Sequence, residues 1–429
     1  MNKLITTLSS VLLTTSVWAG PLSQEESFPS NFGWMKGFPP KDDKILSATD
    51  GSFFKFPALR YSVCHMREFL PTKVVPSAEE GYYHFEVALD SQIDNITFMP
   101  MGSNKPMTWK ESLAKNYTDG MLVLHKGKIV YEKYFGELKP NGTHALMSVS
   151  KTFTGTLGAI LVAEGVLDAN KKVSEYVPAL KKSAFGDATV RNLLDMQTGL
   201  QYSEDYRDPH SEIWQYSAAG TPCKPKGYKG ARTYYQYLQT IKKKGEHGKV
   251  FAYKTVNTDA LGWVISSATG KTIPELISER FWVPLGAQID GYYQIDDYGI
   301  AFAGGGFNAS LRDLGKFGEM VRNKGFFNNK RIMPASVFDD IIQNADNKKF
   351  DKEHYPNLKG WGYRNMWWVT NNKNKAFMAR GVYGQAIYID PTAEMVIVRL
   401  ASTPTAPNND NDPWSLPAYQ ALADYLSKK

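Results

Sequence analysis

Apolar positions recur every three or four residues between 146 and 165, which predicts an α-helix. The helix is expected to begin at Ser148, which opens a run of small residues, and its apolar positions are Phe153, Leu157, Ile160 and Leu161. Just upstream, alternating apolar residues at 120–135 on either side of a Lys-Gly-Lys turn predict a β-hairpin. A helix that begins directly after such a hairpin offers an unpaired backbone N–H and the positive end of its dipole to an anion.

Similar patterns predict the rest of the secondary structure. Helical periodicity indicates further helices at 188–199, 230–245, 256–270, 272–286, 311–325, 333–346 and 416–429. Alternating segments bounded by Asn, Gly and Pro predict strands at Arg364–Thr370, Ala376–Arg380, Gln385–Asp390 and Met395–Ser402. Strands on both sides of a helical insertion at about 166–295 predict an α/β (α+β) fold, in which helices flank an antiparallel sheet and a second lobe is all-helical.

The N-terminal residues have the composition of a secretory signal. One lysine precedes an uncharged run, and the small residues before Gly20 resemble a cleavage site, so residues 1–19 are predicted to be a signal peptide. The run is short for a transmembrane helix, so we expect a periplasmic or secreted protein with no stable membrane insertion after cleavage. Residues 20–95 are predicted to be an extended arm packed on the main body, and residues 96–429 to form one large domain.

Composition narrows the choice of partners. The chain has 429 residues, of which 42% are hydrophobic, as in a globular protein with a large core. Its net charge of +7 is spread in small clusters without interleaved aromatic residues, so no nucleic acid partner is expected. Cys64 and Cys223 could form a disulfide in an oxidising compartment. The seven histidines show no metal-binding spacing, so no metal or other cofactor is expected.

Ser148 is followed three residues later by Lys151. On a helix this spacing places both side chains on one face, where the lysine could act as the base for a serine nucleophile. The spacing alone is weak evidence, because it also occurs at Ser52–Lys55 and Ser112–Lys115. The simplest alternative makes Ser148 an N-cap residue and Lys151 a solvated residue of the first helical turn.

Three segments in a fixed order carry a family resemblance. They are Leu146–Gly155 (LMSVSKTFTG), Phe251–Gly262 (FAYKTVNTDALG) and Ala379–Pro391 (ARGVYGQAIYIDP). Together they resemble the serine β-lactamase-like hydrolases, a family of class C β-lactamases, DD-peptidases and esterases, and most closely its 6-aminohexanoate-dimer hydrolase branch. The resemblance runs from about residue 100 to the C-terminus, and the arm is similar to that branch too. It implies a β-lactamase/penicillin-binding-protein-like fold with residues 96–429 as the catalytic domain.

The resemblance also implies roles for individual residues. Ser148 would be the acylated nucleophile, with Lys151 and Tyr253 as its general base and acid, in an order that the sequence leaves open. Thr255 stands where the family's Tyr-x-Asn motif commonly has Asn or Ser. Tyr206 falls where the branch places a tyrosine over the substrate amide.

The third motif departs from the family pattern. Ala379 and Arg380 stand where Lys-Thr or His-Thr is usual, followed by Gly381. Val382 would then supply a backbone N–H to the oxyanion opposite the N–H of Ser148, with Gly381 and Arg380 as substrate-binding neighbours. Because the usual cationic side chain is replaced by Ala379, we expect weak or absent β-lactam hydrolysis.

These observations lead to one functional hypothesis with alternatives. We expect an exported serine hydrolase that cleaves a small-molecule amide or ester through an acyl-enzyme. A catalytically inactive, penicillin-binding-like envelope scaffold and a β-lactamase or DD-peptidase remain alternatives. An α/β-hydrolase triad is disfavoured, because the chain lacks a Gly-x-Ser-x-Gly motif.

Overall fold

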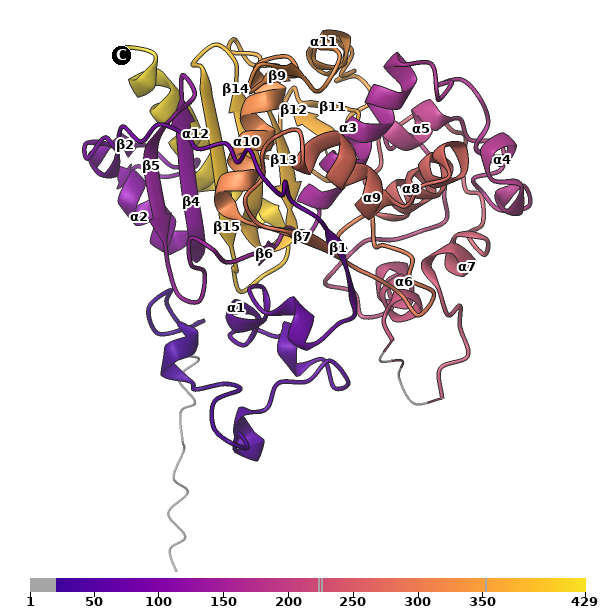
Figure 1. The fold of residues 1–429 in the computed structure, drawn as a ribbon, viewed down its shortest axis with the longest axis horizontal. Coiled ribbons are helices and arrows are strands. Elements are labelled where there is room, and N and C mark those ends of the chain that lie inside the picture. The colour runs from indigo at the N-terminus through magenta and orange to yellow at the C-terminus, as the bar shows by residue number, and fades with distance from the viewer. Residues whose placement is uncertain (1–20, 223, 225–226, 352) are drawn as a thin grey trace, which may run out of the picture.

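The computed structural model describes residues 21–222, 224, 227–351 and 353–429 (Figure 1). The predicted signal peptide and Cys223 lie outside these residues, so signal cleavage and a disulfide with Cys64 stay predictions. A seven-stranded antiparallel sheet forms the centre. In spatial order its strands are β11 (Gly362–Arg364), β12 (Trp367–Val369), β13 (Phe377–Gly381), β14 (Gln385–Asp390), β15 (Met395–Ala401), β4 (Thr118–His125) and β5 (Lys128–Tyr134).

The order of these strands joins distant parts of the chain. The predicted hairpin is confirmed as β4 and β5, and β4 pairs on its other side with β15, where Met395 lies opposite His125. The segment predicted as one strand at 364–370 is instead a second hairpin. Asn365 and Met366 both have positive φ angles, so the chain turns between β11 and β12.

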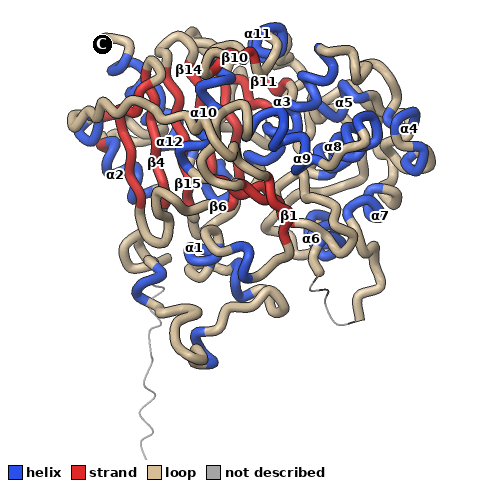
Figure 2. Tube along the Cα trace, in the orientation of Figure 1, coloured by secondary structure: helices blue, strands red, loops and turns tan. Residues whose placement is uncertain are grey.

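Four helices cover the two faces of the central sheet (Figure 2): α2 (Trp109–Lys115), α3 (Val149–Ala163), α10 (Leu311–Arg322) and α12 (Asp412–Leu426). Strand residues alternate between the faces. Leu122 and Val396 meet α10 at its glycines, while Tyr388 faces α12, where its ring centroid lies 5.2 Å from that of Tyr419. Phe153 of α3 stacks on α10, so α3 and α10 form one layer while α2 and α12 form the other.

A second, four-stranded sheet leads into α3. Its strands, in spatial order, are β1 (Thr72–Val75), β7 (Gly291–Gln294), β8 (Phe307–Ala309) and β6 (His144–Ala145). The smaller elements are β2 (Thr97–Phe98) with β3 (Met107–Thr108), β9 (Phe326–Phe327) with β10 (Lys330–Arg331), and α11 (Ala335–Gln343).

The chain between α3 and β7 is largely helical. Its helices are α4 (Val173–Tyr176), α5 (Val190–Leu194), α6 (Glu212–Gly220), α7 (Tyr234–Leu238), α8 (Val256–Thr269) and α9 (Ile273–Ile277), which continues into a π-helical turn at Ser278–Trp282. The predictions for 188–199 and 230–245 were too long. Met196 has a positive φ just after α5, and the backbone of 242–244 bonds to 199–201 instead of extending α7.

The residues predicted to form an arm begin at one end of the molecule (indigo in Figure 1), and after β1 they run across the body to β5, where the N–H groups of Ala88 and Asp90 donate to Ile129 and Val130. They form short 3-10 turns, the one-turn helix α1 (Leu59–Ser62) and strand β1. Arg60 of α1 is 1% exposed, and its Nη2 donates a 2.8 Å hydrogen bond to Asp119 Oδ1 in β4. Burial alone would raise the pKa of Asp119, but the Arg60 guanidinium holds that pKa below its usual value. The boundaries at 95 and 166–295 stay predictions.

Candidate active site

Ser148 directly precedes α3, at the point where the sequence predicted the start of a helix. Its side chain makes no capping hydrogen bond. Its Oγ instead accepts a hydrogen bond from the Nζ of Lys151 at 2.7 Å. The preceding residue, Met147, has a φ of 48°, an uncommon conformation for a residue other than glycine. Ser148 thus occupies the N-cap position of α3, but its side chain bonds to Lys151 and does not cap the helix.

Lys151 is buried beneath Ser148, with 1% of its surface exposed, so it is not a solvated first-turn residue. Its Nζ also donates to the carbonyl oxygen of Gly304 at 2.5 Å. Burial lowers the pKa of Lys151 to about 8, against the opposing influence of Glu204 and Asp259. About one tenth of such lysines are neutral at pH 7, which is sufficient for a general base.

Tyr253 reaches the same site from the segment before α8. The Nζ of Lys151 lies 5.1 Å from the centroid of its ring. The ring packs against Trp368, with centroids 5.3 Å apart, which fixes its orientation. Burial and Glu204 raise the pKa of Tyr253 well above its usual value, while the nearby Ser148 lowers it. The two pKa values are therefore shifted in opposite directions, that of Lys151 down and that of Tyr253 up.

Gly381 brings the end of β13 against the start of α3. A Cβ at this position would lie 2.7 Å from the carbonyl oxygen of Leu146 and 3.1 Å from the backbone nitrogen of Ser148, so the approach requires glycine. Val382 follows and lines the same cavity as Ser148. The Ser148 N–H donates to no acceptor in the part of the chain that the structure describes. The Ser148 N–H is therefore available to an oxyanion.

A cavity of about 500 Å³ opens onto Ser148 and Lys151. Tyr206 lies in its wall, and its hydroxyl donates to Glu204 Oε1 at 3.1 Å. The remaining wall is mostly apolar and includes Phe53, Phe54, Met66, Met147, Ile213, Trp214, Pro222, Tyr234, Ile295, Phe302, Val382 and Tyr383. The structure thus brings Ser148, Lys151, Tyr206 and Val382 to one cavity.

Arg380, which the sequence suggested as a substrate-binding residue, does not line this cavity. Its Nη2 donates to Asp412 Oδ1 of α12 at 2.6 Å, and its guanidinium carbon lies 5.1 Å from the ring centroid of Trp368. The side chain is 5% exposed. This geometry supports a role for Arg380 in fixing β13 to α12 and not direct contact with a substrate.

Two residues that the sequence analysis missed, Asp259 and Glu204, also belong to the site, together with Thr255. Asp259 of α8 accepts a hydrogen bond from the N–H of Gly304 at 3.2 Å, and burial raises its pKa to about 7. Glu204 accepts hydrogen bonds from the backbone N–H and the hydroxyl of Thr255 at 2.5 and 2.6 Å. Thr255, in the position where the family commonly has Asn or Ser, therefore holds the segment that carries Tyr253. An acidic residue within the apolar periodicity of 256–270 was the available signal for Asp259.

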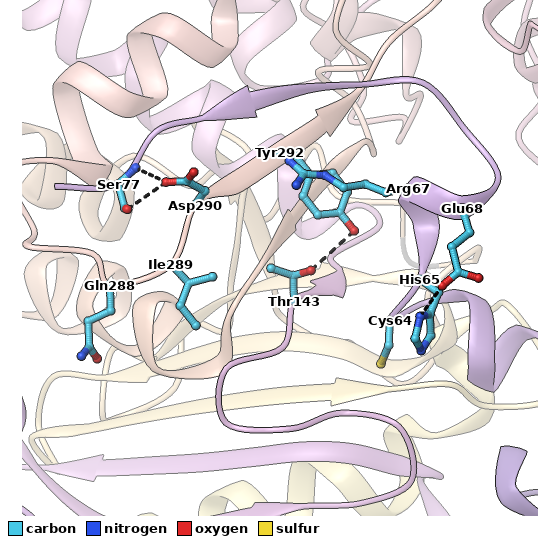
Figure 3. A pocket seen from close by; sticks show the side chains of 10 residues that line it. All are labelled: Cys64, His65, Arg67, Glu68, Ser77, Thr143, Gln288, Ile289, Asp290 and Tyr292. Carbon is cyan, nitrogen blue, oxygen red and sulfur yellow. Dashed lines mark hydrogen bonds and ion pairs between the residues drawn. The ribbon is translucent and has the colours of Figure 1, made fainter. Parts of the chain in front are cut away.

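A second cavity, of about 550 Å³, lies apart from Ser148, between the arm and β7 (Figure 3). Its polar groups bond to one another. Ser77 Oγ donates to Asp290 Oδ1 at 2.8 Å, and Thr143 Oγ1 to the Tyr292 hydroxyl at 3.5 Å. Burial raises the pKa of the Cys64 thiol in its wall well above the usual value. The described lining of this cavity contains no nucleophile held by a buried lysine, as Ser148 is held by Lys151.

Among the described residues the structure contains neither a cluster of metal-binding side chains nor a helix suited to span a membrane. No group of three or more His, Cys, Asp or Glu side chains is placed to hold a metal ion. In that same part of the chain, no helix combines the length and apolar character needed to cross a bilayer.

Comparison with known proteins agrees with this geometry. The profile of the beta-lactamase family matches residues 111–420. The chain belongs to the beta-lactamase family. The 6-aminohexanoate-dimer hydrolase of Paenarthrobacter ureafaciens is 29% identical over 362 residues, which cover 82% of this chain and 88% of that protein. The family resemblance inferred from the three motifs is thereby confirmed, and the protein is a hydrolase of this family.

Solved structures support the same assignment. A structure from Bacillus anthracis, described as a candidate 6-aminohexanoate-dimer hydrolase, has a TM-score of 0.79 and 34% identity, and the alignment covers 88% of this chain and 96% of that one. An octameric penicillin-binding protein homologue from Pyrococcus abyssi has a TM-score of 0.57 and 21% identity, with 74% and 75% of the two chains covered. The predicted β-lactamase/penicillin-binding-protein-like fold is confirmed.

Proposed function

We propose that this beta-lactamase-family hydrolase cleaves small amide or ester bonds through an acyl-enzyme on Ser148. The observation that carries the proposal is the 2.7 Å hydrogen bond between Lys151 Nζ and Ser148 Oγ, made by a lysine whose pKa burial lowers to about 8. A neutral lysine at this distance can take the serine proton as the oxygen attacks a carbonyl carbon.

The remaining groups fit the later parts of such a reaction. As the serine oxygen bonds to the substrate carbonyl carbon, the N–H groups of Ser148 and Val382 would donate to the oxyanion, each contributing about 3–4 kcal/mol by analogy with other enzymes. Collapse of the tetrahedral intermediate would break the bond to the leaving amine or alcohol, which takes a proton from Tyr253. Water would then attack the acyl-enzyme carbonyl and lose a proton to Tyr253. As the bond to Ser148 Oγ breaks and the acid is released, Ser148 Oγ would take back its proton from Lys151.

The substrate is proposed to be a linear amide or ester and not a β-lactam. The name of the Paenarthrobacter relative refers to a dimer of 6-aminohexanoate, which supports a small amide. Ala379, in the position of the family's usual cationic residue, is fully buried in β13 and does not line the cavity. A screen of linear amides, short esters, D-amino-acid peptides and the β-lactam nitrocefin tests this. Nitrocefin turnover with kcat/KM above about 10⁴ M⁻¹s⁻¹ would contradict it.

The alternative is a penicillin-binding-like protein that binds envelope material without turnover. Fluorophosphonate labelling and 4-nitrophenyl acetate hydrolysis, measured on the wild type and Ser148→Ala, separate the two. We expect the wild type to react and Ser148→Ala to lose both signals. Ser112→Ala is the matched control, because Ser112 has the same spacing to a lysine but donates its hydroxyl to the carbonyl of Trp109. A wild type that is neither labelled nor active would favour the scaffold.

We further propose that the protein is exported to the periplasm or beyond. The support is the sequence of residues 1–19, with one lysine before an uncharged run. N-terminal sequencing of the protein from its natural host should give a chain that begins at Gly20. A full-length chain in the cytoplasmic fraction would contradict export.

A further inference from the structure

The wall of the active-site cavity includes residues from the arm. Thr49, Asp50, Phe53 and Phe54 line the cavity together with Ser148. The family profile begins only at residue 111, so this part of the wall lies outside the segment that matches the family. The arm and α6, which lines the cavity from the helical part, lie at the same end of the molecule (Figure 1).

The two phenylalanines pack against the backbone that carries the oxyanion position. The ring centroids of Phe54 and Tyr383 are 5.6 Å apart in an edge-on contact, and those of Phe53 and Phe54 are 5.5 Å apart. Tyr383 directly follows Val382 and has a φ of 63°. Both phenylalanines belong to an apolar cluster that also contains Met147, the residue before Ser148. The arm aromatics therefore pack beside residues that adjoin Val382 and Ser148 in the chain.

Hydrogen bonds tie the arm near this wall to the main body, although the arm has little regular structure. Ala145 of β6 lies three residues before Ser148, and its N–H donates to the carbonyl oxygen of Val63 in the arm at 2.7 Å. The buried Arg60 ties α1 to β4. A wall fixed in this way adds little ordering cost when a substrate binds against it.

The chemistry of the wall selects the group that can fill it. Ile213 and Trp214 of α6 and Phe302 line the cavity as well. Among the described lining residues the charged side chains are Asp50 and Lys151, and Lys151 is engaged by Ser148 and Gly304. Such a wall favours an uncharged hydrocarbon group, and its described residues offer no free cation to a carboxylate.

We propose that Phe53 and Phe54 form a subsite for an apolar hydrocarbon chain of the substrate, next to the bond that is cleaved. The inference rests on the proposed function and specifies its substrate class: esters or amides with an unbranched apolar chain on either the acyl or the leaving-group side. Each buried methylene is expected to raise kcat/KM by up to about fourfold until the cavity is filled.

Two ester series test the subsite and distinguish the two sides. The first varies the acyl chain of 4-nitrophenyl esters from acetate to decanoate, and the second varies the alcohol of alkyl acetates from ethyl to octyl. We expect wild-type kcat/KM to rise about 30-fold or more from the shortest to an eight-carbon chain in one series. Phe53→Ala and Phe54→Ala should each lower kcat/KM for the eight-carbon substrate at least fivefold more than kcat/KM for the shortest substrate. Phe54→Leu, which keeps an apolar side chain, should retain most of the preference.

Phe56→Ala is the matched control, because Phe56 is an aromatic residue of the same arm that packs on Tyr117 and does not line the cavity. It should leave the chain-length preference unchanged, and circular dichroism should show all variants folded. Turnover of the shortest esters without a chain-length effect in either series, or an effect that survives both alanine variants, overturns the subsite alone. A wild type without any turnover overturns the proposed function and the subsite with it.

Discussion

Replacing Lys151 by arginine separates a base from a positive charge at the same position. Lys151 Nζ donates to Ser148 Oγ and to Gly304 O, and an arginine could reproduce the charge and part of this hydrogen bonding. It could not reproduce the neutral form, because a guanidinium does not lose its proton in this pH range. Arginine is also a good helix former, so α3 itself should tolerate it. Lys151→Arg and Lys151→Ala should therefore be similarly inactive.

The size of the effect follows from the pKa of about 8 that burial gives Lys151. Half of these lysines are neutral at pH 8, whereas an arginine with a pKa above about 12 is neutral in at most roughly one molecule in 10⁴. The loss of active base predicts a fall in kcat/KM of about 10³ to 10⁴, equivalent to about 4–5 kcal/mol of transition-state stabilisation.

The assay is hydrolysis of 4-nitrophenyl acetate at pH 8 by the wild type and both variants, with circular dichroism to show that all are folded. Lys254→Arg is the matched control. Burial lowers the pKa of Lys254 to about 8 as well, but its Nζ donates to the carbonyl oxygen of Leu200 at 2.6 Å and not to Ser148. The control should remain within tenfold of wild type. A Lys151→Arg enzyme within tenfold of wild type would refute the reasoning and leave proton transfer to Tyr253 or another group.

Three more expectations follow from the same structure. Wild-type kcat/KM should rise about 50-fold between pH 6 and pH 8 and level off above, since the neutral form of Lys151, with its pKa of about 8, increases with pH; a flat profile would contradict it. Gly381→Ala should lower the free energy of unfolding, measured with denaturant, by about 1–3 kcal/mol and should also lower kcat, because the new Cβ would lie 2.7 Å from Leu146 O. A variant with the wild-type free energy of unfolding and the wild-type kcat would show that β13 can shift. Arg60→Ala should lower the free energy of unfolding by about 3–5 kcal/mol, because it removes the arginine that pairs with the buried carboxylate of Asp119. Arg207→Ala, which removes an exposed ion pair, should lower it by less than about 1 kcal/mol, and equal losses would contradict the argument.

Local patterns predicted those features that depend on neighbouring residues. The 120–135 hairpin and the helix that begins after Ser148 follow from periodicities of two and 3.6 residues, and both are present as β4–β5 and α3. The same reasoning failed at the ends of α5 and α7. There the backbone of 242–244 bonds to 199–201, a pairing between distant segments that helical propensity cannot anticipate.

The sequence by itself determined the family, the order of its three motifs and the spacing of Ser148 and Lys151, because these are properties of the linear chain. Only the tertiary structure decided which Ser-x-x-Lys pair is joined by a hydrogen bond, and it directed Arg380 toward Asp412. It also decided the acidity of Lys151, whose Nζ meets the carbonyl of Gly304, 153 residues away in sequence. Burial is the sum of contacts from segments that are distant along the chain, so the pKa shift that makes a lysine a base arises only when those segments pack together.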